Sequence, residues 1–383
     1  MNTERHIDEL RAQFPVIKRY TYLNHAAVGP LPQRVLDEVS RINQDKGYSG
    51  GLHWMDWEDE AEKTRKIIAR FINAHPEEIA FTQNTSAGLS IIANGLNWEK
   101  TDNIVVNDLE FPSNLFPWQI QAKRHGLVTK TVQQRNEELA MDAFEQEIDS
   151  HTKIVAVSHV QFSNGFKVDL QHLSKLAHEN GGYVITDAVQ SLGQMPINVK
   201  KLDVDFLATS GYKWLLSPIA TGFLYIKKEL IDEIEPSIVG YRTDENHHEF
   251  SYRTITPAKN ARRFEHGQIN FPGIAGMQAA IELLEGYGIL NIERRIRELV
   301  DVLIAGISEL RGLKVLSSLK QEHRNGLVKV GGLENPEEMV AKLKEDNIVI
   351  SSRAGGLRIS PHFYNTEEEI KKLLETLSLL TQS

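Results

Sequence analysis

The chain has 383 residues, 41% of them hydrophobic and 25% charged, which is typical of a soluble globular protein large enough for two domains. Its formal net charge of -9 predicts no basic surface of the kind that binds nucleic acid or anionic membranes, so we expect neither partner. The complete absence of cysteine excludes disulfides, thiolate metal sites and attack on a substrate by a protein thiol.

The N-terminal segment MNTERHIDEL is charged, and no stretch approaches the roughly 18 apolar residues that a membrane span requires. We therefore expect a cytoplasmic protein. The chain has 14 histidines, but none has the spacing of a zinc motif. We expect the neighbouring His247 and His248 in a solvated loop, and we predict no metal site.

Strands and helices are predicted to alternate through the first two thirds of the chain. A strand at FTQ leads through Asn84 into a helix that begins near Thr85 and Ser86. Short β-branched runs then predict strands at NIVVND, KIVAVSHV, YVITDA, DFLATS and TGFLYI. Segments between them, such as LQHLSKLAHEN, have helical spacing. This alternation predicts a mainly parallel sheet covered by helices, an α/β fold.

The pattern changes after Gly276. The predicted elements are helices near 277–286 and 292–310, strands at LKVLSS and GLVKVGG, a helix opened by Asn335 and Pro336, strands within 347–360, and a last helix. Thr366 and Glu369 form a capping box for that last helix. We predict a large α/β domain over 21–274 and a smaller α+β domain formed by 1–20 and 275–383.

Several candidate functional residues follow predicted strands. In open α/β folds, ligands bind beyond the carboxyl ends of the strands, and the residues at such ends here are Phe111, Asp187, Ser210 and Lys213. Asp187 closes YVITDA, and Gln190 follows it by three residues. This pair would place a carboxylate and an amide in the crevice, although an aspartate at a strand end is also a common helix cap.

The helix start at Thr85 and Ser86 offers free amide N–H groups, small hydroxyls and the positive end of a helix dipole. These groups suit a phosphate. The alternative interpretation is an ordinary N-cap.

Lys213 lies between Tyr212 and Trp214 in the segment DFLATSGYKWLL, directly after a buried strand. Apolar surroundings lower the pKa of a lysine and make it a better nucleophile at neutral pH, which indicates an imine-forming amine. The alternative is a lysine at a strand end whose ammonium reaches solvent. We expect Trp214 to pack in the core.

These features together specify pyridoxal 5′-phosphate (PLP). A lysine provides the imine, an acid pairs with the pyridinium nitrogen, an aromatic side chain covers the ring, and a helix start binds the phosphate.

Six motifs occur in order along nearly the whole chain: YLNHAAVGPLP, FTQNTSAGL, LEFPSNLFPW, ITDAVQSLGQMPINVKKLDVDFLATSGYKWL, RRFEHGQINFPGIAG and GLRISPHFYNTEEEI. As a set they resemble the class V aminotransferase family of fold-type I PLP enzymes, which includes cysteine desulfurases, kynureninases and isopenicillin N epimerase. The resemblance implies a fold-type I PLP-dependent transferase, a PLP cofactor and an amino-acid substrate.

The resemblance also implies a role for individual residues. Lys213 is the Schiff-base lysine that later moves the α-proton, and Asp187 pairs with the pyridine nitrogen. Gln190 approaches the phenolic oxygen, and Phe111 covers the ring. The remaining matched positions are those on the phosphate side, Thr85, Ser86, Ser210 and Tyr212, and the arginine that binds the substrate's carboxylate, Arg358.

Some positions depart from the desulfurase pattern. Desulfurases have histidines where this chain has Tyr212 and Phe111, and both choices resemble kynureninases. The loop that carries the desulfurase cysteine is expected between Arg353 and Arg358, where this chain has only RAGGL and no cysteine. Arg353 is either a second cation for the substrate or part of a salt bridge at the domain interface. His25 matches a position that lines the substrate side.

The resemblance implies a homodimer with shared active sites, in which EHGQINFPG reaches the partner's site. Either Gln268 or Asn270 then contacts the partner's phosphate.

We predict a PLP-dependent class V aminotransferase-like enzyme acting on an amino acid. The same residues serve transamination, epimerisation or racemisation, and cleavage of a C–S or C–C bond at the β-carbon. The alternatives are therefore an isopenicillin N epimerase-like enzyme or a β-lyase without a catalytic cysteine. An alternative of another class is a non-catalytic PLP-binding module, against which the intact Lys213, Asp187 and Arg358 argue.

Overall fold

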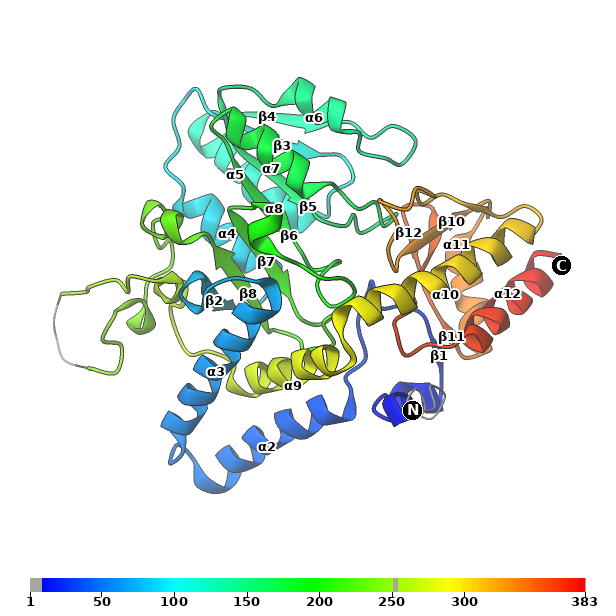
Figure 1. The fold of residues 1–383 in the computed structure, drawn as a ribbon, viewed down its shortest axis with the longest axis horizontal. Helices are drawn as coiled ribbons and strands as arrows, with labels where there is room; N and C mark the ends of the chain where they lie inside the picture. Colours follow the sequence, from blue (N-terminus) through cyan, green and yellow to red (C-terminus); the bar gives the residue numbers. More distant parts are fainter. Residues whose placement is uncertain (1–8, 251–253, 383) are drawn as a thin grey trace.

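The computed structural model describes residues 9–250 and 254–382, which form a larger and a smaller unit (Figure 1). A seven-stranded sheet in the order β2-β8-β7-β6-β5-β3-β4 is the centre of the larger unit. Its strands are β2 (Ile79–Thr82), β3 (Asn103–Asn107), β4 (Val128–Val132), β5 (Thr152–Ser158), β6 (Tyr183–Asp187), β7 (Phe206–Ser210) and β8 (Gly222–Ile226).

Strands β3 to β7 are parallel to one another, and β8 is antiparallel to its neighbours β7 and β2. The prediction of a mainly parallel sheet is therefore confirmed, and every strand predicted over this region is present. Strand β4 was not predicted from the sequence. This strand lies at the edge of the sheet, and only Val132 among its residues is buried, so it lacks the continuous apolar run of the central strands.

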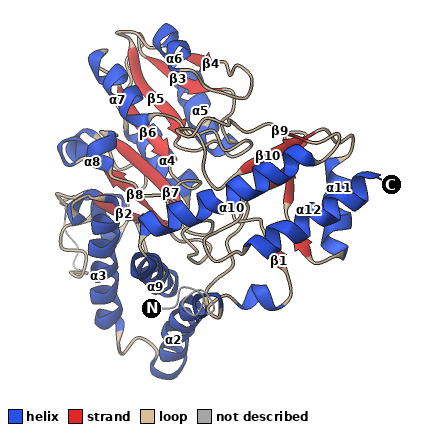
Figure 2. Ribbon diagram, turned by 45° about the vertical axis from the view of Figure 1, so that its right-hand side comes forward, coloured by secondary structure: helices blue, strands red, loops and turns tan. Residues whose placement is uncertain are grey.

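The sheet is buried on both faces because successive side chains of its strands enter two different cores. Val105, Val155 and Leu207 belong to one core, whereas their neighbours Ile104, Ile154 and Ala208 belong to the other. The covering helices are α4 (Thr85–Gly95), α5 (Phe116–His125), α6 (Met141–Glu147), α7 (Leu170–Glu179) and α8 (Val199–Leu202). The long helices α2 (Gln33–Ser49), α3 (Trp54–Ile72) and α9 (Phe271–Tyr287) pack against one another on the β2 side of the sheet (Figure 2).

The smaller unit contains a four-stranded antiparallel sheet in the order β12-β13-β10-β9. Its strands are β9 (Lys314–Val315), β10 (Val328–Gly331), β12 (Ser351–Arg353) and β13 (Gly356–Ile359), and its helices are α10 (Ile289–Glu309), α11 (Pro336–Glu345) and α12 (Glu367–Gln382). The capping box predicted for the last helix is confirmed, because Glu369 N–H donates to Thr366 Oγ1 (3.3 Å) and Thr366 N–H donates to Glu369 Oε2 (2.9 Å).

The N-terminal part of the chain joins this smaller unit. Strand β1 (Thr21–Tyr22) pairs in parallel with β11 (Ile348–Val349). The predicted boundaries, 21–274 for one domain and 1–20 with 275–383 for the other, remain a prediction, and residues 1–8 lie outside the described part. Among the described residues, no helix is both long and apolar enough to cross a membrane.

Candidate active site

The N-terminus of α4 brings together hydroxyl groups from three segments. Thr85 N–H donates to Ser210 Oγ (2.9 Å), and the hydroxyl oxygens of Thr85 and Ser210 lie 3.2 Å apart. Ser86 Oγ donates to Ser113 Oγ (2.8 Å). The N-cap itself is Asn84, whose side chain accepts the N–H of Ala87 (2.9 Å). The hydroxyls predicted to bind phosphate are therefore not needed for capping, and they lie at the positive end of the helix dipole.

Asp187 ends β6 with a buried carboxylate. Its Oδ1 accepts the N–H of Val189 at 2.8 Å, which forms a local turn and caps no α-helix. Burial raises the pKa of Asp187 and the charge of Glu110 raises it further, whereas the Val189 hydrogen bond and Lys213 lower it. A buried carboxylate of this kind is stabilised by a cationic or proton-donating ligand.

The Lys213 amine lies among aromatic rings close to Asp187. Its Nζ is 5.9 Å from the ring centroid of Phe111 and 5.7 Å from that of Tyr212. Burial lowers the pKa of Lys213, and the charge of Arg358 lowers it further, while Asp187 raises it. The geometry thus brings together the predicted amine, acid and aromatic face, and it favours an amine that is readily deprotonated.

Arg358 on β13 extends from the smaller unit toward this group. Its guanidinium donates to the carbonyl oxygen of Phe162 (2.9 Å) and to Ser351 Oγ (3.3 Å). Burial and the nearby Arg353 lower the pKa of Arg358 to about 10. No carboxylate within the described residues forms an ion pair with Arg358. A buried guanidinium without a carboxylate is suited to bind an anionic ligand group.

The segment RAGGL forms a tight hairpin. Arg353 pairs with Gly356, and the two residues between them, Ala354 and Gly355, have positive φ angles of 48° and 74°. Such angles are those of a two-residue hairpin turn. The turn is short, and its correspondence to the desulfurase cysteine loop remains a prediction. Arg353 is exposed at this turn and donates to the carbonyl oxygen of Ser352 (2.8 Å). It forms no salt bridge with any of the residues that the structure describes, and its positive charge lowers the pKa of Arg358.

Trp214, which was predicted only to pack in the core, also orients Gln190. Trp214 is fully buried as expected, and its Nε1–H donates to Gln190 Oε1 (2.9 Å). One hydrogen of the Gln190 amide is donated to the carbonyl oxygen of Ala26 (3.0 Å). An amide nitrogen carries two hydrogens, so the other remains available for a ligand.

His25 has no hydrogen-bonding capacity left for a substrate. It is fully buried, its Nδ1 lies 2.9 Å from the carbonyl oxygen of Ser360, and its Nε2 lies 2.7 Å from the hydroxyl of Tyr364. Because a carbonyl only accepts, Nδ1 carries the proton and Nε2 accepts from Tyr364. The geometry therefore assigns His25 to the contact between the N-terminal segment and the smaller unit, and argues against the predicted substrate contact.

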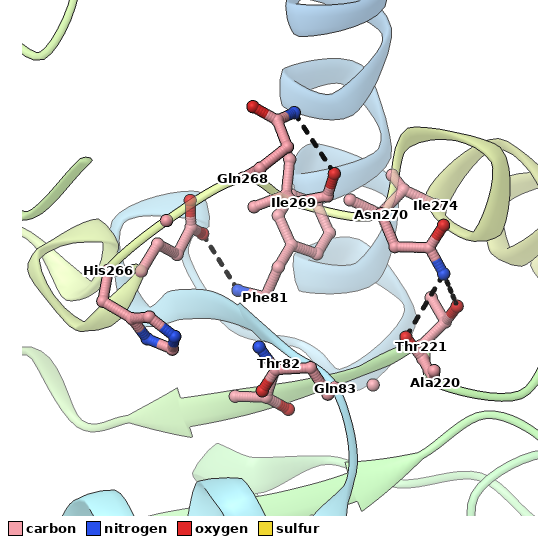
Figure 3. A pocket seen from close by; sticks show the side chains of 13 residues that line it. Phe81, Thr82, Gln83, Ala220, Thr221, His266, Gln268, Ile269, Asn270 and Ile274 are labelled. Carbon is pink, nitrogen blue, oxygen red and sulfur yellow. Dashed lines mark hydrogen bonds between the residues drawn. The ribbon is translucent and has the colours of Figure 1, made fainter. Parts of the chain in front are cut away.

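The two candidates for a contact with a partner subunit differ in their surroundings (Figure 3). Asn270 caps α9 by accepting the N–H of Gly273 (3.1 Å), and it donates to Thr221 Oγ1 (3.2 Å). Gln268 is exposed and accepts from the hydroxyl of Tyr241 (3.0 Å). Both line a cavity of about 200 Å³. Both side chains are exposed and both form hydrogen bonds within their own chain, but Asn270 is held as the cap of α9, whereas Gln268 caps no helix.

Sequence reasoning missed two residues at this site. Glu110, directly before Phe111, is buried with its carboxylate fully hydrogen-bonded. Phe162 packs its ring against that of Phe111, with centroids 5.1 Å apart and planes at 74°. A charged residue in LEFPSN carries no sequence signal of burial. Phe162 could have been found only as an aromatic residue that follows a strand end.

A family model described as aminotransferase class-V matches residues 21–373. The chain belongs to the class V aminotransferase family. The family and fold implied by the six motifs are thereby confirmed, and this member of the family is a PLP-dependent enzyme with the fold-type I architecture.

Three relatives of this class V aminotransferase family member illustrate the range of the family. A probable cysteine desulfurase of Pyrococcus abyssi is 33% identical, with 98% of each chain covered. The solved structure of an apo cysteine desulfurase from Thermococcus onnurineus NA1 has a TM-score of 0.90, 31% identity and 98% coverage of both chains.

The third relative is C-DES, described as a cystine C-S lyase. Its complex with the reaction product cysteine persulfide has a TM-score of 0.89 and 25% identity, covering 96% of this chain and 99% of that one. A variant of C-DES has been solved with glycine covalently linked to the PLP cofactor, at 26% identity and a TM-score of 0.89, covering 96% of this chain and 98% of that one.

The donor groups of this site fit PLP. Thr85, Ser86 and Ser210 offer hydroxyls and a helix N-terminus for the phosphate, and the raised pKa of buried Asp187 suits a pyridinium N–H. Lys213 supplies an amine beside the exposed ring of Phe111.

Proposed function

We propose that this enzyme cleaves the bond between the β-carbon and a sulfur leaving group of an α-amino acid by β-elimination. The observation that carries the proposal is the two-residue turn at Ala354 and Gly355 in a chain without cysteine. Persulfide transfer needs a thiolate that attacks the substrate's sulfur, and a hydroxyl is too weakly acidic to replace it. The likeness to a relative named as a cystine C-S lyase supports the same chemistry.

Three of the predicted residues have a task in this reaction. Arg358 binds the substrate's α-carboxylate, which orients the bonds at the α-carbon. Lys213 Nζ removes the α-proton, and its depressed pKa suits a base at neutral pH. Asp187 keeps the proton on the ring nitrogen. PLP, when bound, withdraws electrons from the α-carbon. The C–S bond then breaks with its electron pair on sulfur, and hydrolysis leaves pyruvate and ammonia.

Product analysis tests the proposal. With cysteine or cystine as substrate and no added thiol, we expect pyruvate and ammonia in equal amounts together with released sulfur. Stoichiometric alanine would contradict the proposal. A keto acid formed only with an amino acceptor would indicate a transaminase, and inversion of the α-carbon an epimerase. PLP binding without turnover of any amino acid in a panel would indicate a non-catalytic module.

We propose further that the enzyme is a homodimer in which Gln268 contacts the partner's PLP phosphate. Gln268 is exposed beside Tyr241, whose ring centroid lies 6.0 Å from that of Phe250. Phe250 is 83% exposed, and Ile219, which directly precedes the cavity-lining residue Ala220, is 71% exposed. Apolar side chains this exposed are typical of a surface that a second copy covers. The cytoplasmic location remains a prediction.

The dimer is tested by placing a charge on this surface. We expect Ile219→Glu to shift the protein toward monomer in analytical ultracentrifugation and to weaken PLP binding, because a carboxylate buried at an interface lacks a partner. Leu379→Glu on α12 is the matched control, since Leu379 is also 71% exposed. A wild-type protein that is monomeric and fully active at nanomolar concentration would contradict the shared site.

A further inference from the structure

Glu110 has a buried carboxylate surrounded by hydrogen-bond donors. Its Oε1 accepts from the N–H of Ser158 (2.6 Å), Asn107 Nδ2 (2.7 Å) and Gln161 Nε2 (3.0 Å). Its Oε2 accepts from Ser158 Oγ (2.6 Å) and Asn114 Nδ2 (3.1 Å). Both oxygens accept hydrogen bonds, and none of these donors is a cation. These five hydrogen bonds to Glu110 thus all come from neutral groups.

These donors follow or end strands β3 and β5, which adjoin the predicted ring contacts Phe111 and Asp187. Asn107 ends β3, and Asn114 ends the short 3₁₀ turn Pro112–Asn114 that follows Phe111. Ser158 ends β5 and pairs in register with Asp187 on β6. The backbone N–H of His159 next to it donates to the carbonyl oxygen of Asp187 (3.0 Å). Glu110 therefore lies between the loop that carries Phe111 and the strand end that fixes Asp187.

The Glu110 carboxylate is also connected, through Gln161, to the segment that contacts Arg358. Gln161, which donates to Glu110, precedes Phe162. The carbonyl oxygen of Phe162 accepts from Arg358, and its ring contacts that of Phe111. One buried side chain thus connects the segments that carry the predicted ring face, the predicted ring acid and the carbonyl that holds the predicted carboxylate-binding arginine.

We propose that Glu110 is a positioning residue of the PLP site, whose carboxylate fixes Phe111 and Asp187 relative to each other. Its position requires an acceptor at both oxygens. A glutamine in its place presents an N–H toward one set of donors, and the N–H of Asn114 or of Ser158 then faces another donor. Glu110 also affects Asp187 directly, because its charge raises the pKa of the Asp187 carboxyl. Asp187 therefore pairs more strongly with a protonated ring nitrogen.

The test is Glu110→Gln in the purified enzyme. We expect the dissociation constant for PLP to rise by about tenfold or more, the effect of losing one buried charge-assisted hydrogen bond. We also expect the circular dichroism of the bound PLP band, per mole of PLP, to fall, because the ring is no longer held in one orientation. Neither readout depends on knowing the substrate, so the proposal stands apart from the proposed β-elimination.

Glu78→Gln is the matched control. Glu78 is also buried and accepts the backbone N–H groups of His75 (2.6 Å) and Lys228 (3.1 Å), but it touches none of the site residues. We expect Glu78→Gln to lower the unfolding midpoint while the PLP readouts stay at wild-type values. Equal loss of stability in both variants, with wild-type PLP affinity and dichroism in Glu110→Gln, would overturn the proposal and leave Glu110 a structural residue.

Ser158→Ala decides the matter if Glu110→Gln does not fold. This change removes only the hydroxyl that donates to Glu110 Oε2 and keeps the backbone N–H bond to Oε1. A weaker change of the PLP readouts in the same direction supports the positioning role. Wild-type values in Ser158→Ala would then overturn it.

Discussion

Replacing Lys213 with alanine is expected to abolish turnover and the covalent attachment of PLP. The amine is the only group predicted both to hold the cofactor and to move the α-proton, so its loss removes two steps at once. The measurement is the absorption band of bound PLP, combined with borohydride reduction and peptide mass mapping. In the wild-type enzyme the label should be on the peptide that contains Lys213.

The matched control for this variant is Lys167→Ala. Burial lowers the pKa of Lys167 too, but Lys167 lines a cavity with Asp169, Glu293 and Glu322, away from the α4 N-terminus. We expect Lys167→Ala to keep PLP and turnover. A Lys213→Ala protein that still carries reducible PLP after dialysis would show that another lysine forms the bond.

The sheet and the main polar residues of the site were predictable because each has a local signal. Buried parallel strands are continuous apolar runs, and the residues at their carboxyl ends meet at one edge. Asp187, Ser210 and Lys213 could therefore be placed near one another from the sequence, and the structure does bring Asp187 and Lys213 within electrostatic reach. β4 was missed because an edge strand with exposed side chains lacks that apolar run.

The residues that were missed or misplaced depend on contacts far apart in the chain. His25 lies in the motif YLNHAAVGPLP and matches a position on the substrate side, but its ring is held by Ser360 and Tyr364, more than 300 positions away. Nothing local in the sequence indicates that Glu110 is buried. Its hydrogen-bond donors Ser158 and Gln161 are distant in the chain and meet it only in the folded protein. Pattern and propensity describe neighbours along the chain, whereas the orientation of a buried polar group is decided by its tertiary partners.

Replacing Asp187 with asparagine is expected to lower kcat by about 10², or about 2.7 kcal/mol in the barrier, the scale of one lost electrostatic stabiliser. Asparagine keeps the shape of the side chain and can still accept the N–H of Val189, so PLP binding should persist. What is lost is the charge that keeps the ring nitrogen protonated. The measurement is kcat per mole of bound PLP.

A second buried carboxylate on the same sheet provides the control for this charge effect. Asp205 is buried just before β7, at the amino end of the strand. Its Oδ2 accepts the N–H of Val184 (2.7 Å) and lies 2.8 Å from His178 Nε2, with which it forms a hydrogen bond. Asp205→Asn should cost stability, since it weakens the contact with His178, but it should leave kcat unchanged because the predicted site lies beyond the carboxyl ends of the strands. If Asp187→Asn turned over at the wild-type rate, Asp187 would have no part in the mechanism, and the ring proton would have to be held by another group.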